Sequence, residues 1–233
     1  MKEAKKKPKS GQIVPEDVAA IRKQIRAFLD TPTANGLKIG NARWGVYAFF
    51  DYDAEPIYVG QTNEMLRSRI GRHLTNQRTD AVAMNVLDPF EVAEIELWPL
   101  WELQAKKSND KDAKAILNSA EYTVFQQVLE QSSFKAVLNE ADIAPTTKME
   151  LPSSVRGRII PDELYKSRKH PDIRIARRAT TIASLARVIS EREVSKGLRR
   201  TLLTQAKRLE SLAGKRLNEI GGTIPEVEPG EEV

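Results

Sequence analysis

Two short apolar runs separated by an acidic turn constrain the fold of this chain more than any other feature. The runs cover residues 45–50 (GVYAFF) and 56–60 (PIYVG), and the connection between them contains two aspartates and a glutamate. Apolar runs of this length, bounded by turn-forming residues, are typical of buried strands. The pattern therefore predicts a β-hairpin, with Tyr47 on one strand and Tyr58 on the other.

The two tyrosines have two interpretations. Side chains from paired antiparallel strands can project from the same face of a sheet, so Tyr47 and Tyr58 can present their hydroxyls to one ligand. Tyrosine is also common in strands because its ring packs well while its hydroxyl meets water. On the hairpin alone, the packing interpretation is favoured.

Periodicity predicts further elements around this hairpin, and together they make the fold class α+β. Helical spacing of apolar residues predicts helices before the hairpin, directly after it and later in the chain, while alternation of apolar and acidic residues predicts a third strand. We expect a small three-stranded antiparallel sheet flanked by helices, and a helical basic C-terminal extension. The predicted elements are helices at 15–30, 64–74 and 113–131, a strand within 90–100, a short extended piece at 134–140, and helices at 172–191 and 192–214.

The charge is unevenly distributed and suggests a division of the chain. The net charge is +5, but residues 41–150 carry 11 basic and 17 acidic residues, whereas residues 151–220 carry 17 basic and 7 acidic residues. An acidic module flanked by basic segments indicates a polyanionic partner that is held by the flanks. The predicted domains are a basic arm with an N-terminal helix (1–40), a central module (41–145), a basic helical extension (146–220) and an acidic disordered tail (221–233).

Composition excludes several kinds of chemistry. The chain has no cysteine, so disulfides, thiolate zinc sites and a cysteine nucleophile are excluded, and a reducing compartment is expected. Only His73 and His170 are available as histidine ligands or bases. No apolar run approaches the length of a membrane helix, and we expect a cytoplasmic protein with no membrane partner.

Two further segments carry side chains suited to phosphate chemistry. Arg69 and His73 lie four residues apart in a predicted helix, so one turn places them on the same face. An arginine can hold a phosphate through two contacts, and a histidine can exchange a proton near neutral pH. Glu121 lies on the apolar stripe of its helix, where a carboxylate needs a partner such as Mg²⁺ or a basic side chain. The alternatives are a solvated basic face and a paired boundary glutamate.

The order of these parts resembles that of the GIY-YIG nuclease family. GVY in one strand, YVG in the next, a helix with Arg and His at i and i+4, a Glu in a later helix and an Asn after it match the family over roughly residues 43–140. The family includes homing endonucleases, certain restriction endonucleases and the incision nuclease of bacterial excision repair. Either tripeptide alone is a weak signal, but five elements in order are a strong one.

The resemblance implies a role for each matched residue. Tyr47 matches the tyrosine proposed to deprotonate the attacking water, and Tyr58 would position that water or the scissile phosphate. Arg69 would stabilise charge on the phosphoryl group, and His73 would act as a second base or hydrogen-bonding group. Glu121 resembles the single metal-binding glutamate, which implies Mg²⁺ or Mn²⁺ as cofactor.

Asn139 matches the asparagine that steadies the site in this family. Its spacing from Glu121 is longer than usual for the family, which makes an extra turn or loop between them necessary. Gln61 follows YVG where many members carry a basic residue. This second departure weakens assignment to a subgroup more than it weakens the catalytic assignment.

The resemblance implies a metal-dependent DNA endonuclease of the restriction, defence or mobile-element type, bacterial or phage-encoded. A catalytically inactive DNA-binding protein on the same fold, and a nuclease for RNA or single-stranded DNA, are the alternatives. Duplex DNA is the expected partner, and homodimerisation stays open. Because the central module is net negative, DNA contacts are expected from the basic extension. The predicted DNA-binding residues are Arg156, Arg158, Arg168, Lys169, Arg177, Arg178, Arg199 and Arg200.

Overall fold

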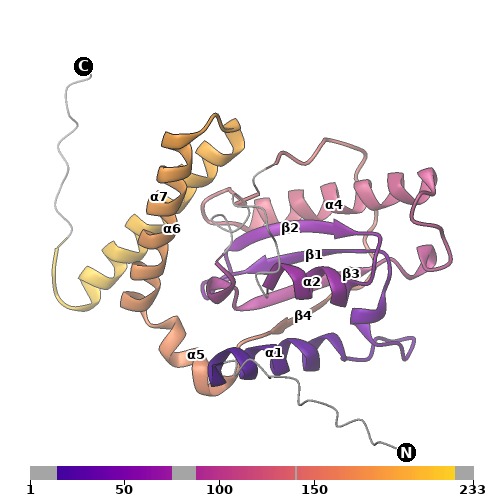
Figure 1. Cartoon of the computed structure of the whole chain (residues 1–233), viewed down its shortest axis with the longest axis horizontal. Coiled ribbons are helices and arrows are strands. Elements are labelled where there is room, and N and C mark those ends of the chain that lie inside the picture. Colours follow the sequence, from indigo (N-terminus) through magenta and orange to yellow (C-terminus); the bar gives the residue numbers. More distant parts are fainter. Residues whose placement is uncertain (1–14, 75–87, 140, 224–233) are drawn as a thin grey trace, which may run out of the picture.

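A four-stranded antiparallel sheet forms the centre of the protein (Figure 1), in a computed structural model that describes residues 15–74, 88–139 and 141–223. The strand order is β2-β1-β3-β4, so that the hairpin strand β1 lies inside the sheet and β2 lies at one edge. The strands are β1 (Gly45–Phe50), β2 (Pro56–Thr62), β3 (Glu94–Pro99) and β4 (Val155–Arg158).

Helices cover both faces of the sheet and one end of it. Helices α1 and α2 pack on one face and α4 packs on the other. Helices α6 and α7 form a helical hairpin beyond the turn that joins β1 to β2, and α5 leads into it (Figure 1). The helices are α1 (Glu16–Leu29), α2 (Leu66–Leu74), α4 (Lys111–Gln131), α5 (Asp162–Lys169), α6 (Pro171–Glu191) and α7 (Lys196–Glu219).

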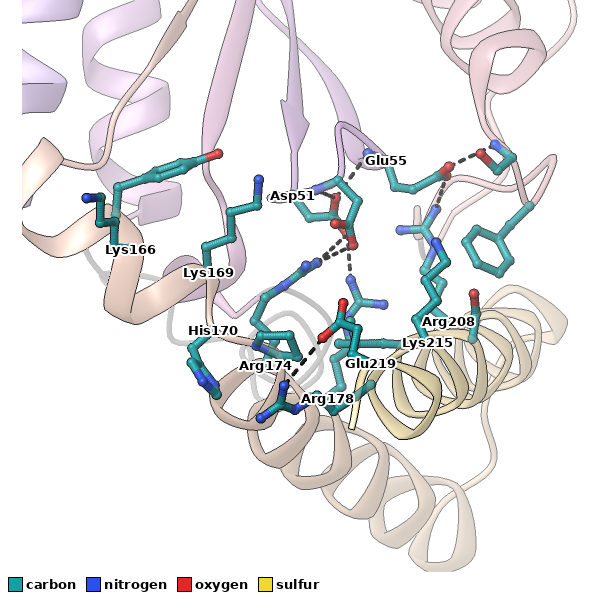
Figure 2. A pocket seen from close by; sticks show the side chains of 18 residues that line it. Asp51, Glu55, Lys166, Lys169, His170, Arg174, Arg178, Arg208, Lys215 and Glu219 are labelled. Atoms are coloured by element: carbon teal, nitrogen blue, oxygen red, sulfur yellow. Dashed lines mark hydrogen bonds and ion pairs between the residues drawn. The ribbon is translucent and has the colours of Figure 1, made fainter. Parts of the chain in front are cut away.

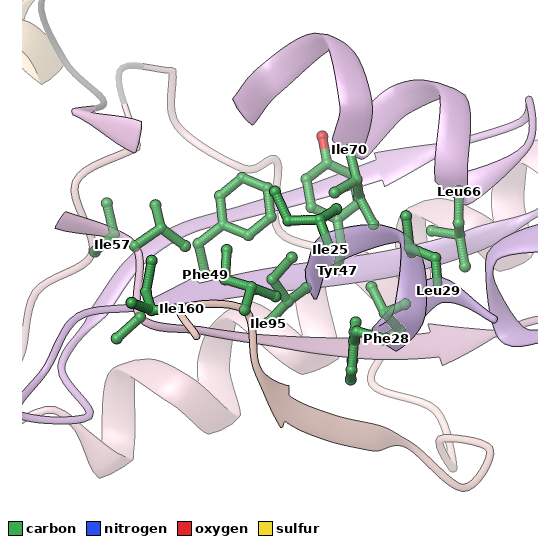
Figure 3. Close-up of a cluster of buried hydrophobic side chains, with 14 of the residues drawn as sticks. Ile25, Phe28, Leu29, Tyr47, Phe49, Ile57, Leu66, Ile70, Ile95 and Ile160 are labelled. Carbon is green, nitrogen blue, oxygen red and sulfur yellow. The ribbon is translucent and has the colours of Figure 1, made fainter. Parts of the chain in front are cut away.

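Strand β1 is buried along its whole length. Its alternate side chains divide between two cores because successive residues of a strand point to opposite faces. Tyr47 and Phe49 pack toward α1 and α2 (Figure 3), whereas Val46, Ala48 and Phe50 pack toward α4. This two-sided burial explains why the GVYAFF run lacks the polar alternation of a half-exposed strand.

The predicted α+β class is confirmed, but the sheet has four strands and not the expected three. The additional strand β4 pairs with β3 and comes from the segment assigned to the basic extension. Its Gly157 lies against the ring of Phe28 in α1, and a Cβ at this position would be 2.6 Å from Phe28 Cε2. Arg156 donates to Glu94 of β3 at 2.7 Å, so an ion pair supplements the backbone pairing.

One predicted extended segment is not a strand in the structure, and two other predicted segments are described only in part. Residues 134–139 form no strand, although Leu138 N donates to the carbonyl of Ile57 in β2 at 3.0 Å. Residues 1–14, within the expected basic arm, and residues 224–233, within the expected acidic tail, lie outside the described residues. No helix in the described part of the chain is long and apolar enough to cross a membrane.

Acidic residues at the β1–β2 turn fasten the C-terminal helices to the sheet. Asp51 shapes the turn, because its Oδ1 accepts hydrogen bonds from the backbone N–H groups of Asp53 and Glu55 at 2.8 and 3.0 Å. Its Oδ2 accepts from Arg178 at 2.5 Å and from Arg174 at 3.4 Å, both in α6. The side chains of Asp51 and Arg174 are each 2% exposed, so these ion pairs are fully enclosed.

A second buried arginine connects α7 to the same turn. Arg208 donates to the carbonyls of Pro56 and Ala136 at 3.1 and 2.9 Å, and lies 3.5 Å from Glu55 Oε2. Glu55 also accepts hydrogen bonds from Ser132 and Ser133, directly after α4. The turn therefore holds α6, α7 and the end of α4 together through charge-assisted hydrogen bonds.

Replacement of Asp51 by alanine is expected to destabilise the protein by about 3 kcal/mol, since two buried guanidinium groups lose the carboxylate that they share and two N–H groups of the turn lose their acceptor, although Arg174 keeps its contact with Asp53. Urea unfolding, followed by circular dichroism, measures this change. Asp162→Ala is the matched control, because Asp162 pairs with Arg158 on the surface and is exposed. A loss as small as that of the control would show that the turn does not anchor the helices.

Candidate active site

The hairpin presents Tyr47 and Tyr58 on one face of the sheet. Tyr47 is paired with Gly60 and Tyr58 with Phe49, so the two tyrosines are diagonal neighbours. Their ring centroids are 6.1 Å apart. A Cβ on Gly60 would lie 2.6 Å from Tyr47 Oη and 2.6 Å from Tyr58 Cε1. The glycine of YVG therefore provides the space in which the two phenols meet.

Helix α2 brings the arginine and the histidine to the same place. Arg69 Nε donates to Tyr47 Oη at 3.2 Å, and Tyr47 Oη lies 3.1 Å from His73 Nε2. The His73 ring is buried, and its centroid is 5.3 Å from that of Tyr58. Sequence reasoning placed Arg69 and His73 on one helical face, and the structure shows that this face meets both tyrosines.

Burial decides the protonation state of Tyr47. Desolvation raises the pKa of the Tyr47 phenol far above its ordinary value, and the neighbouring Tyr58 raises it further, while Arg69 offsets only part of the rise. The phenol therefore keeps its proton at neutral pH. Its oxygen accepts from Arg69, so its own O–H can donate to Nε2 of a neutral His73.

Glu121 enters the site from α4, on the other side of β2. Burial raises its pKa to about 7, and hydrogen bonds from Gln61 together with the charge of Arg69 offset part of the rise. Its charge also acts on Tyr47, which raises the pKa of the phenol slightly. Glu121 is therefore within electrostatic reach of both Arg69 and Tyr47.

A cleft of about 310 Å³ opens beside these residues, between the end of β2, α2 and α4. Arg69 lines the cleft, together with Gln61 and, from α4, Lys114 and Asn118. Gln61 Nε2 donates to Asn118 Oδ1 at 2.9 Å, which ties the edge strand to α4 one turn before Glu121. Arg69 from α2 and Lys114 from α4 both contribute positive charge to the lining of the cleft.

The oxygen donors in this cleft fit a divalent ion that is held mainly by water and substrate. Within the described ranges no group of three or more His, Asp or Glu residues could hold a metal. Glu121 supplies a carboxylate beside the cleft, whereas Glu64, the carboxylate that lines it, is paired with Arg72. The buried Oε1 of Gln61 accepts no hydrogen bond in the described part of the chain. Mg²⁺ commonly uses one or two protein oxygens, several waters and substrate phosphates. The donor set is therefore compatible with such an ion.

Gln61 and Lys114 are site residues that sequence reasoning did not assign. Gln61 was visible only as a departure from the family pattern, directly after Gly60. Lys114 lies seven residues before Glu121, which is two helical turns along the same face. Helical spacing from Glu121 could have identified it.

Asn139 lies outside this cluster of side chains. It pairs with the backbone of Val59, accepting from its N–H at 2.9 Å and donating to its carbonyl at 2.7 Å. Val59 lies between Tyr58 and Gly60. Asn139 therefore pairs with the backbone N–H and carbonyl on the free edge of β2 directly beside these two residues. This contact is consistent with the predicted steadying role, which stays a prediction.

Two of the predicted DNA-binding arginines are buried in the protein. Arg168 contacts Asp17 of α1 at 3.2 Å, and Arg178 contacts Asp51 at 2.5 Å. Their guanidinium groups face other parts of the chain because nearby carboxylates compensate them. They are therefore not retained in the proposed DNA-binding surface.

The other predicted DNA-binding residues are at least partly exposed. Lys169 and Arg199 are exposed and have no carboxylate within ion-pair distance among the described residues. The remaining four also contact other parts of the chain: Arg156 contacts Glu94, Arg158 contacts Asp162, Arg177 donates to the Phe90 carbonyl, and Arg200 contacts Asp142.

Two tyrosines of a hairpin, an Arg/His helix and a carboxylate from α4 therefore lie together beside the cleft that Arg69 lines. Residues 43–125 match the GIY-YIG catalytic domain, which confirms the resemblance for this segment. The match includes Tyr47, Tyr58, Arg69, His73 and Glu121 but ends before Asn139. No curated protein and no solved structure matches the chain significantly.

Gly60→Ala is expected to lower nuclease activity about 100-fold, because its methyl group would collide with Tyr47 and Tyr58 and displace both phenols. Gly71→Ala is the matched control, since a Cβ at Gly71 of α2 meets nothing within 4 Å. Initial rates on plasmid DNA and melting temperatures would be measured for both variants. Full activity of a folded Gly60→Ala protein would contradict the assigned geometry.

Proposed function

We infer that this protein is a divalent-metal-dependent endonuclease that hydrolyses phosphodiester bonds of duplex DNA at specific sites. The observation that carries the proposal is the chain of contacts from Arg69 to Tyr47 to His73 beside the cleft. A match to a nuclease family supports the reaction class. Restriction, defence and mobile-element nucleases, bacterial or phage-encoded, are the kinds of enzyme proposed.

The chain's own residues supply proton transfer and charge stabilisation. As water attacks phosphorus, Tyr47 Oη takes the water proton while its own proton passes to His73 Nε2, which lies 3.1 Å away. A phenol of raised pKa can act in this relay because it never has to exist as a free phenolate. The relay therefore assigns His73 as the final proton acceptor.

Arg69 and Tyr58 act on the phosphate. Arg69 lines the cleft and supplies fixed positive charge where negative charge develops on the phosphoryl oxygens. Tyr58 positions the scissile phosphate or the water from the same face of the hairpin. The bond between phosphorus and the 3′ oxygen breaks, and the leaving oxygen departs on the side opposite the attacking water.

Glu121, with Gln61 beside it, would hold Mg²⁺ or Mn²⁺ at this cleft. A bound divalent ion would supply Lewis-acid stabilisation of the phosphate and of the leaving 3′ oxygen. Asn139 would keep the edge strand in place during these steps.

Substrate binding is proposed for the segments outside the matched domain. In this division residues 41–145 perform the chemistry and residues 146–220 hold the DNA. Exposed basic residues such as Lys169 and Arg199 are proposed to contact phosphates. Two cuts in a duplex need two active sites or two binding events, so a homodimer acting on DNA is included in the proposal.

The deciding experiment is cleavage of supercoiled plasmid and linear phage DNA, with Mg²⁺ and with chelator. Discrete fragments that need Mg²⁺ are expected from the wild-type protein. Glu121→Ala is expected to abolish them, and Tyr47→Phe to reduce cleavage by at least about 100-fold through loss of the relay hydroxyl. Glu130→Ala is the control, because Glu130 is exposed at the end of the same helix.

Other outcomes would favour other functions. No cleavage of any substrate, with salt-sensitive DNA binding intact, would leave a DNA-binding protein on a nuclease fold. Faster cleavage of RNA or single-stranded DNA in competition with duplex would replace the substrate in the proposal.

Metal affinity is expected to depend on pH through Glu121. A cation binds the carboxylate but not the carboxylic acid, so affinity rises with pH until Glu121, with its pKa of about 7, is ionised. Below pH 7 the apparent Mn²⁺ affinity should fall about tenfold per pH unit. Titrations of the DNA-free protein with Mn²⁺ between pH 5.5 and 8.5, read by electron paramagnetic resonance, measure this. Affinity that is flat below pH 7, or equal in Glu121→Gln, would contradict it.

A further inference from the structure

A second hollow, of about 690 Å³, lies between the β1–β2 turn and helices α5, α6 and α7 (Figure 2). It shares no lining residue with the catalytic cleft. Its volume is in the range of small-molecule sites, and much of its wall comes from residues outside the matched domain. The catalytic mechanism does not use it.

The deep wall of this hollow is electrically compensated. Arg174 and Arg178 are held by Asp51, and Arg208 is held by Glu55 and by backbone carbonyls. These arginines are buried and fixed, so they serve mainly to join the helices to the turn. They would give a ligand a preformed polar surface at the bottom of the hollow.

The lining of the hollow as a whole carries an excess of positive charge. Seven Lys or Arg side chains line the hollow against four Asp or Glu side chains, which is a net charge of +3. Lys169 extends from α5 toward the turn, and Lys215 comes from α7 on another side (Figure 2). Both are exposed, and neither has a carboxylate within ion-pair distance in the described part of the chain. Their charges are therefore available to a ligand.

The field of Lys215 reaches the interior of the hollow. Burial raises the pKa of Asp53, but a hydrogen bond from Arg174 and the charges of Arg178 and Lys215 outweigh burial and hold that pKa below its usual value. An anion placed between Lys169 and Lys215 would experience the same positive field.

Neutral groups complete the site. The rings of Tyr165 in α5 and Phe134, after α4, line the hollow, as do the hydroxyl-bearing residues Ser133 and Ser211. The Lys169 ammonium lies 5.7 Å from the centroid of Tyr165, so an amine and an aromatic surface adjoin each other. Aromatic rings beside ammonium groups suit a ligand that has a flat base and a phosphate.

We propose that this hollow binds the phosphate of a nucleotide unit, with Lys169 and Lys215 as its charged contacts and the ring of Tyr165 beside the sugar or base. The unit is either a free nucleotide or part of the nucleic acid chain. The second source rests on the proposed function, whereas the first does not. Binding at this site requires neither Glu121 nor a divalent ion.

The test uses the full-length protein in chelator, so that no DNA is cleaved. ATP binding is measured by calorimetry, and binding of a short fluorescein-labelled DNA duplex is measured by anisotropy at several salt concentrations. The pocket variant is Lys169→Ala with Lys215→Ala, and the control is Lys23→Ala with Lys111→Ala, two exposed lysines outside the hollow and outside residues 146–220. All four lysines are exposed, so both variants are expected to fold, and circular dichroism confirms this.

The pocket variant is expected to weaken one of the two probes about tenfold or more, while the control changes neither. A loss confined to ATP identifies a free nucleotide. A loss for the duplex, with a salt slope reduced by about one per lysine, identifies the nucleic acid backbone. Unchanged binding of both probes, equal losses in the two variants, or no binding of either probe by the wild-type protein overturns the proposal. Plasmid cleavage with Mg²⁺ is scored separately, so failure of the pocket is distinguishable from failure of the nuclease assignment.

Discussion

Strand β1 is buried on both faces, and the rest of the fold follows from the need to cover it. Its backbone is paired on both sides, with β2 and with β3, so none of its polar groups depends on water. One face requires α1 and α2, and the other requires α4. The same requirement places Tyr47 under α2, which is what brings Arg69 and His73 to a phenol.

The central part of this arrangement could be predicted from sequence because it depends on short-range periodicity. The hairpin, the shared face of Arg69 and His73, and the inward direction of Glu121 all follow from spacing within one element or between adjacent ones. Gly60 adds a steric condition that the YVG motif contains but does not explain by itself. The need for glycine is clear only from the structure, because a Cβ at this position would lie 2.6 Å from Tyr47 Oη.

The parts that could not be predicted depend on pairing between distant segments. Strand β4 has four residues, two of them arginines, and only its pairing with β3 identifies it as a strand. Arg174, Arg178 and Arg208 appear in sequence as members of a basic surface. They are buried because carboxylates of the hairpin turn, more than 120 residues earlier, compensate them. The charge of a segment therefore does not reveal which of its residues face solvent.

The contrast in charge between the central module and the C-terminal helices has two structural consequences. Some of these charges form buried ion pairs inside the protein, and these pairs orient α6 and α7 on the β1–β2 turn. Such pairs contribute little net stability but make loss of one partner costly, which favours a single docked arrangement. The remainder appears at the surface as lysines and arginines without partners, and only this remainder can attract a polyanion.

Desolvation has the same origin at Tyr47 and Glu121 but opposite consequences for chemistry. Both groups are driven toward their neutral forms because the site is enclosed. For Tyr47 this suits the proposed relay, since a protonated phenol between Arg69 and His73 could transfer a proton without carrying charge. For Glu121 it opposes the proposed metal binding, and a bound cation would overcome it by favouring the carboxylate. An enclosed site of this kind, in which Arg69 stays charged while Tyr47 is neutral, would stabilise the charge of a bound phosphate more strongly than a solvated site could.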